Sequence, residues 1–182
     1  MGTFNYVNEE LLSTDDDVLT VHVSDLAQIK NMALSSARGR ARLCAHHNGG
    51  DPLHEMLIAL VKDNYIRPHK HPGKTESFHM IEGRLMIVIF NDDGKVLQCV
   101  HLSAPTCPSP DEQAFYYRLA IPMYHTVIPM TEVAVFHETT NGPFRPEDTF
   151  FADWSPSESD DKSVQSAYIQ EILQHSLVKS NN

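Results

Sequence analysis

The sequence predicts an all-β fold, a sandwich or barrel of antiparallel strands with a short helix before it and a helix after it. Short segments rich in Val, Ile, Leu and Phe recur at close, even spacing. Gly, Pro and Asn-Asp turns separate them, and Asp93-Gly94 is a strong hairpin signal. Apolar residues at helical spacing mark the two flanking segments. This combination is typical of a small β domain rather than of a parallel α/β fold.

The elements follow in order along the chain. A strand is expected over residues 18–23 and a helix over residues 26–37, with Ser24 or Asp25 as its N-cap. A Gly- and Pro-containing turn at 48–52 follows. Further strands are expected at 56–61, 65–71, 77–81, 84–90, 95–102, 115–121, 125–128 and 132–139. A polar linker at 155–161 then precedes a helix over residues 164–177.

These elements divide the chain into three parts. Residues 1–50 form a strand and helix extension packed on the β region, residues 51–154 form that region, and residues 155–182 form the linker and last helix. A chain of 182 residues buries a core without disulfides. The three cysteines form no CxxC pair, which is typical of thiols in a reducing compartment.

Charge and hydropathy restrict the partners. The formal charge of -10 argues against nucleic acid and anionic membrane surfaces. No run approaches the ~20 apolar residues of a membrane span. We therefore expect a cytoplasmic protein whose partner is a small molecule, with a homodimer as a further expectation that no sequence feature proves.

The segment from His69 to Glu76 carries the main functional signal. His69 and His71 stand two apart in a predicted strand, so both side chains point to one side of it. Glu76 returns on the next strand after a short Pro-Gly turn. Two imidazoles and one carboxylate within reach of each other favour a divalent transition ion, with Fe, Mn, Zn and Ni as candidates.

The same alternation predicts the pocket lining. If His69 and His71 face inward, so does Arg67, whose guanidinium either binds an anionic ligand or pairs with a buried acid such as Glu138. Phe78 faces inward together with Glu76. His137 and Glu138 are neighbours on one strand, so only one of them faces the cavity, and the sequence leaves open which.

The pattern His69-x-His71-x4-Glu76-x6-Gly83 is similar to the first motif of the cupin superfamily, and Pro122-Met123-Tyr124-His125 stands where the second cupin motif lies. This resemblance implies a jelly-roll β-barrel in which His69, His71, Glu76 and His125 are the four metal ligands. Tyr124 adjoins His125 and is a candidate hydrogen-bond donor to the ligand, but its adjacency to His125 also predicts that it faces the other way. The sequence departs from both motifs. Asp63 stands where the first motif has glycine, and the second motif lacks its usual glycine between Pro122 and His125 and has Pro129 in place of the usual asparagine.

A closer resemblance is to the WbuC family of cupin-fold metalloproteins, which occur among polysaccharide and O-antigen biosynthesis functions. It is carried by the segments 65–74, 82–85, 90–94, 141–144 and 154–156. It implies that the chain binds or converts a small sugar-derived or organic-acid metabolite at an open metal site. An iron-dependent dioxygenase and a non-catalytic metal-dependent ligand-binding module are the alternatives, and the sequence does not decide whether the protein is an enzyme.

Overall fold

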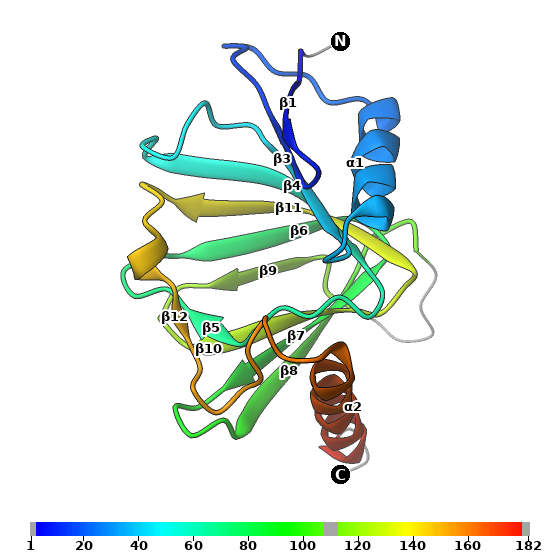
Figure 1. Ribbon diagram of the computed structural model, residues 1–182, viewed down its shortest axis with the longest axis vertical. Helices are drawn as coiled ribbons and strands as arrows, with labels where there is room; N and C mark the ends of the chain where they lie inside the picture. Colours follow the sequence, from blue (N-terminus) through cyan, green and yellow to red (C-terminus); the bar gives the residue numbers. More distant parts are fainter. Residues whose placement is uncertain (1–2, 108–112, 180–182) are drawn as a thin grey trace.

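The computed structural model describes residues 3–107 and 113–179, and within them the strands form two sheets (Figure 1). Sheet A has the strand order β1-β2-β3-β4-β11-β6-β9. Its strands are β1 (Asn5–Asn8), β2 (Leu11–Ser13), β3 (Arg40–Cys44), β4 (Leu53–Val61), β6 (Glu76–Glu82), β9 (Tyr116–Leu119) and β11 (Val133–Asn141). Most neighbouring strands are antiparallel, and only the β2–β3 pair is parallel within the named strands of the described chain.

Sheet B has the order β12-β5-β10-β7-β8. Its strands are β5 (His69–Lys70), β7 (Arg84–Phe90), β8 (Val96–Ser103), β10 (Tyr124–Pro129) and β12 (Phe150–Phe151). From β4 to β11 the chain crosses between the sheets after every strand except at the β7–β8 hairpin, which stays in sheet B. The resulting orders, β4-β11-β6-β9 and β5-β10-β7-β8, are the double Greek-key connectivity of a jelly roll. The predicted all-β fold is confirmed, but in the described residues the two sheets face each other as a sandwich and do not close into a barrel.

Alternating side chains build a core on each side of the sheets. In β7, Leu85, Ile87 and Ile89 point between the sheets, whereas Met86, Val88 and Phe90 point outward. Helix α2 (Lys162–Lys179) covers that outer face, and helix α1 (Val23–Ser35) covers sheet A (Figure 1). A short 3-10 helix, η1 (Pro146–Asp148), precedes β12. Because both faces of β7 are buried, its sequence is a continuous apolar run.

The first predicted strand was wrong. Residues 18–22 form no strand, and α1 begins at Val23, three residues before the predicted start of the helix. The reason is local: the carboxylate of Asp25 accepts a hydrogen bond of 2.7 Å from the backbone N–H of His22, the N-cap residue. This hydrogen bond stabilises the first turn of α1, so the valine-rich segment before it leads into a helix and not into a strand.

The strand predicted over residues 65–71 is also shorter than expected, since only His69 and Lys70 are assigned to β5. Pro68 lacks a backbone N–H and cannot donate to a sheet ladder. The preceding residues instead form an extended segment, in which the carbonyl of Ile66 accepts a hydrogen bond of 2.5 Å from Thr126 Oγ1. Among the described residues, no helix is long and apolar enough to cross a membrane.

Candidate functional site

Three histidines meet on sheet B. His125 of β10 pairs in register with His69 of β5, and their ring centroids lie 4.7 Å apart. His71 follows two residues after His69 and lies on the same side, with a ring-centroid distance of 4.9 Å to it. The cross-strand pair and the alternation of side chains therefore bring three imidazoles together at one end of the sandwich.

Glu76 reaches this cluster from the opposite sheet. It begins β6 in sheet A, and its buried carboxylate lies between two of the histidines. His125 Nε2 is 3.1 Å from one carboxylate oxygen, and His71 Nε2 is 3.4 Å from the other. The structure thus brings the four predicted ligand residues together, three from sheet B and its flanking loop and one from sheet A.

Backbone carbonyls orient all three rings. His69 Nδ1 lies 2.8 Å from the carbonyl oxygen of Arg67, His125 Nδ1 lies 3.0 Å from that of Met123, and His71 Nδ1 lies 3.3 Å from that of Asp148. A carbonyl oxygen only accepts hydrogen bonds, so Nδ1 of His69 and of His125 carries the proton and donates. In a neutral ring this leaves the lone pair on Nε2, the arrangement found in metal-binding histidines. His71 Nδ1 also lies 3.4 Å from the hydroxyl of Thr149, which can act as its donor.

The surroundings favour neutral imidazole at His69 and an ionised carboxylate at Glu76. Burial, together with the neighbouring His125 and His71, lowers the pKa of His69 to about 3. Burial also lowers the pKa of His71. Burial alone would raise the pKa of Glu76, but the hydrogen bond with His125 and the nearby histidine rings lower it to about 2.

These side chains form a hydrogen-bonded cluster and not a finished coordination sphere. In residues 3–107 and 113–179, no group of three or more His, Cys, Asp or Glu side chains stands in a geometry that would hold a metal ion. The donor chemistry nevertheless suits one. His125 already donates through Nδ1, so a hydrogen bond from its Nε2 to Glu76 requires a second proton on the ring, and a divalent cation between the two groups would replace that proton.

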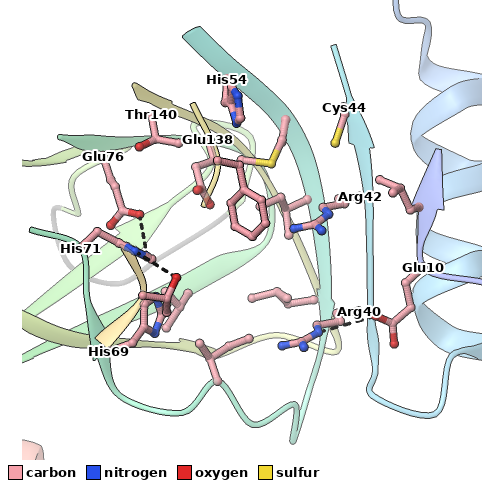
Figure 2. Close-up of a pocket in the computed structure, with 18 of the residues that line it drawn as sticks. Glu10, Arg40, Arg42, Cys44, His54, His69, His71, Glu76, Glu138 and Thr140 are labelled. Carbon is pink, nitrogen blue, oxygen red and sulfur yellow. Dashed lines mark hydrogen bonds and ion pairs between the residues drawn. The ribbon is translucent and has the colours of Figure 1, made fainter. Parts of the chain in front are cut away.

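A cavity of about 590 Å³ opens beside the cluster and extends along the inner face of sheet A (Figure 2). This volume lies within the range of small-molecule sites. Its wall includes the apolar side chains Met56, Ile58, Phe78, Val127 and Phe136. The cavity therefore joins a polar end, where the histidines lie, to a stretch of apolar wall.

Of the residues predicted to contact a ligand, some line the cavity and one, Tyr124, does not. Phe78 and Arg67 line the cavity, but Arg67 donates to the carbonyl of Ala152 at 2.8 Å and lies over the ring of Phe151. Tyr124 faces away from His125. It packs against Trp154, and its ring lies beneath the ammonium group of Lys70. Neighbouring residues on a strand point to opposite faces, which explains the position of Tyr124.

The choice between His137 and Glu138 is resolved by the same alternation. Glu138 lines the cavity, whereas His137 points to the other face of sheet A, with its Nε2 3.7 Å from a carboxylate oxygen of Glu55. Burial and the charge of Glu76 raise the pKa of Glu138 to about 8, against the opposing effect of Arg42. Glu138 is thus a neutral acid at pH 7 inside a cavity that also holds an ionised one.

Sequence reasoning missed the wall that β3 contributes. Arg40, Arg42 and Cys44 alternate along this strand and all line the cavity. Thr140 lies beside Glu76 in register, and its buried hydroxyl has no hydrogen-bond partner in the described chain. The alternation of Arg40-Ala41-Arg42 in the sequence was a usable signal, but only strand pairing reveals which face is the inner one.

Comparison with known proteins gives a partial match in sequence. A family model described as a domain of unknown function, DUF6016, matches residues 21–102, which is less than half of the chain. No curated protein matches the sequence. The matching family is not the WbuC family that the motifs resemble, so membership of WbuC stays a prediction.

Solved structures give a likeness in fold. A crystal structure of a protein from Shewanella oneidensis superposes with a TM-score of 0.54 at 8% identity, covering 72% of this chain and 85% of that one. An oxalate oxidase and CapF bound to 3-isopropenyl-tropolone each give a TM-score of 0.48 at 15% identity. They cover 69% and 62% of this chain, which spans 61% and 31% of theirs. Since both scores lie below 0.5, neither identifies the fold or function of this chain.

Proposed function

We propose that this protein is a cupin-type metalloprotein with an open site for one divalent transition ion, facing a cavity that binds a small molecule. His69, His71, Glu76 and His125 are the proposed ligands. The jelly-roll strand order supports the cupin assignment, because cupins are among the folds with this connectivity. The part in surface-polysaccharide metabolism implied by the WbuC resemblance is supported by that resemblance alone.

One observation carries the proposal: Nδ1 of each of the three histidines lies against a backbone carbonyl, which turns Nε2 toward the other side of the ring, and two of these Nε2 atoms lie beside Glu76. Two ligands about 2.1 Å from one ion stand roughly 3.0 Å apart at a right angle and roughly 3.4 Å apart at a tetrahedral angle. The observed separations of 3.1 and 3.4 Å agree with both.

The chain's own residues define what the site does. The imidazoles and Glu76 supply one negative charge to a divalent cation, so the loaded site is positive and attracts an anionic or chelating molecule. When bound, the ion supplies Lewis acidity toward a carbonyl or hydroxyl oxygen of that molecule. Glu138 holds a proton on the opposite wall and Phe78 and Phe136 exclude water, so both proton transfer and simple ligand binding are compatible with the cavity.

Metal analysis of protein purified without chelator tests the proposal. We expect about one equivalent of a divalent transition ion in the wild type and a large loss in His71→Ala, because that variant removes one donor. His137→Ala is the matched control, since it removes a histidine from the opposite face of sheet A. Circular dichroism should show both variants folded. Equal metal content in His71→Ala and the wild type, or none in the wild type after reconstitution, would contradict the proposal.

A further inference from the structure

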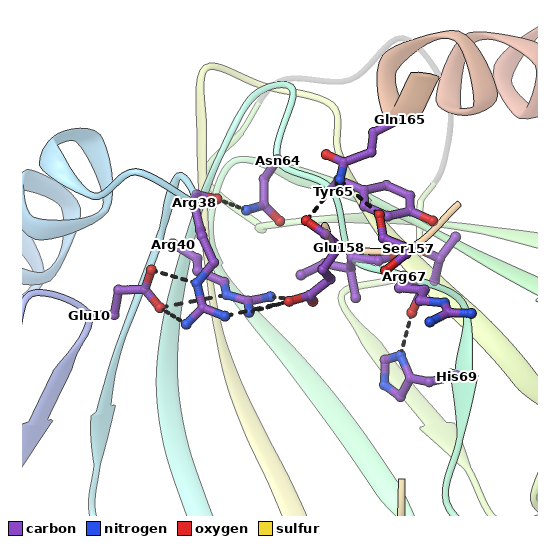
Figure 3. A network of polar contacts seen from close by, with 12 residues as sticks. Glu10, Arg38, Arg40, Asn64, Tyr65, Arg67, His69, Ser157, Glu158 and Gln165 are labelled. Carbon is purple, nitrogen blue, oxygen red and sulfur yellow. Dashed lines mark hydrogen bonds and ion pairs between the residues drawn. The ribbon is translucent and has the colours of Figure 1, made fainter. Parts of the chain in front are cut away.

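The cavity wall opposite the histidines carries a cluster of positive charge, and part of it is already neutralised. Arg38, in the turn before β3, and Arg40, at the start of β3, both contact the carboxylates of Glu10 and Glu158 (Figure 3). Glu10 comes from the loop after β1 and Glu158 from the segment before α2. Two cations and two anions thus balance each other, and this network closes one side of the cavity without attracting a ligand.

Other cations that line the cavity have no carboxylate partner in the described part of the chain. Lys74 Nζ donates to the carbonyl of Pro143 at 2.9 Å, and Arg67 donates to that of Ala152. Arg42 differs from both. Its guanidinium is exposed to the cavity and makes no hydrogen bond or ion pair with any described residue. All five of its N–H donors are therefore available to a ligand.

The position of Arg42 fixes what lies between it and the histidine cluster. In sheet A, β4 and β11 separate β3 from β6, so the two strands lie three spacings, roughly 14 Å, apart. Along the strand direction Arg42 is level with Met80, which stands four residues, roughly 13 Å, from Glu76 on β6. Arg42 pairs in register with Ile58, and Ile58 pairs with Phe136. Figure 2 shows Arg42 pointing into the same space as Glu76 and His71. A molecule that reaches from one end to the other crosses an apolar surface.

Glu138 forms no direct pair with Arg42, although the charge of Arg42 lowers the pKa of this carboxyl. It projects from β11 into the same cavity, yet no hydrogen bond or ion pair joins it to Arg42 across the described residues. Burial and the charge of Glu76 keep this carboxyl protonated at neutral pH by raising its pKa to about 8. A neutral acid forms no ion pair with the guanidinium and does not repel an incoming anion, and its O–H is a further donor.

We propose that the ligand is a small acid with three parts: chelating oxygens at the histidine end, an apolar body along Ile58 and Phe136, and a carboxylate that Arg42 binds. This inference rests on the proposed function and names the substrate class of that site. A guanidinium binds a carboxylate through two parallel hydrogen bonds, which sets the orientation of the molecule as well as its charge. Arg42 is thus the residue that selects acids over uncharged analogues.

Two probes that differ only in the carboxylate test the inference. Isothermal titration compares 3,4-dihydroxybenzoate with catechol on zinc-loaded protein, because zinc does not oxidise the diol. We expect the wild type to bind the acid about tenfold or more tightly than catechol, the range of hydrogen bonds to a charged group. Arg42→Gln should bring the ratio close to one. Arg118→Gln should leave it unchanged, since Arg118 is exposed and lies opposite Ser77 on the other face of sheet A.

Zinc content measured on the same samples separates the two proposals. If all three proteins hold zinc and Arg42→Gln keeps the wild-type ratio, the acid subsite is wrong while the metal site stands. If the zinc-loaded wild type binds neither probe, or binds both equally, the subsite is likewise wrong. A wild type that holds no zinc overturns the proposed function and this inference with it.

Discussion

Glu76 and Glu138 face the same cavity, but their surroundings shift the pKa of the two carboxyl groups in opposite directions. Glu76 is buried, but the hydrogen bond with His125 and the nearby rings bring its pKa to about 2. Glu138 has no such partner among the described residues, and burial together with the charge of Glu76 raises its pKa to about 8. Two carboxyl groups whose pKa values differ this much provide one anion and one proton donor at the same pH. The ionised carboxylate of Glu76 therefore suits a metal ligand, and the protonated carboxyl of Glu138 suits a proton donor in the cavity wall.

Replacing Glu138 by Gln should change how stability depends on pH. Between the ordinary carboxyl pKa of 4.5 and about 8, the folded protein keeps the proton that the unfolded chain releases. The unfolded state then binds fewer protons, so the free energy of unfolding of the wild type falls as pH rises through this window. Relative to Glu138→Gln, we expect the wild type to lose on the order of 2 kcal/mol between pH 5 and pH 8, allowing for partial exposure.

Urea unfolding at these two pH values measures the effect, with Glu147→Gln as a control because Glu147 is an exposed glutamate in the short helix η1. The control should run parallel to the wild type. A Glu138→Gln curve that also runs parallel to the wild type would show that Glu138 is ionised in the folded protein, and its assignment as a neutral acid would be wrong.

Single residues differ in how far the sequence could place them. His69, His71 and Glu76 are close in the chain, so side-chain alternation and one turn bring them together in a prediction. His125 came only from the resemblance to a second motif. The sequence could not predict that Arg42 points into the cavity, because the face on which it lies depends on the pairing of β3 with β4 across the turn at 48–52. The metal-ligand role of the four residues remains a prediction.

At the scale of elements, α1 shows how a helix attaches to a sheet that already has a core on its other face. Ile29 and Ala33 are buried, and they pack on the outer face of sheet A with Leu43, Ala59 and Val135. The helical periodicity of the sequence predicted this face. It could not predict the start of the helix, because the hydrogen bond between Asp25 and His22 competes with a strand-like composition in the preceding residues.

Ile29→Ala should therefore destabilise the protein by about 2–4 kcal/mol, the cost of removing a fully buried aliphatic side chain. Leu34→Ala is the matched control on the same helix, since Leu34 is 54% exposed and Ile29 is 0% exposed. Its cost should stay below about 1 kcal/mol. Chemical denaturation of both variants measures the difference. Equal losses would mean that α1 contacts sheet A through another face.

At the scale of the whole molecule, the candidate site depends on both sheets. Glu76 belongs to sheet A, whereas His69 and His125 belong to sheet B. Between the sheets, residues such as Phe78, Ile87 and Phe136 form the apolar core that holds them together. The sequence predicted strands in the region from β4 to β11 and the mostly-β class, but it missed β1, β2, β3 and β12. Closure into a barrel was wrong, because closure depends on pairing at sheet edges that no local pattern specifies.

An ion held by residues of both sheets should link the two halves of the sandwich. Such an ion binds the folded chain and not the unfolded one, so it raises stability by mass action, by about 2.7 kcal/mol when its free concentration is a hundred times Kd. Protein stripped with a chelator and dialysed should melt at a lower temperature than the same sample reloaded with zinc. The shift should persist in His137→Ala and disappear in His71→Ala. If reloaded wild type holds zinc but melts at the temperature of the stripped protein, the ion binds folded and unfolded chain alike, and the proposed site between the two sheets is wrong.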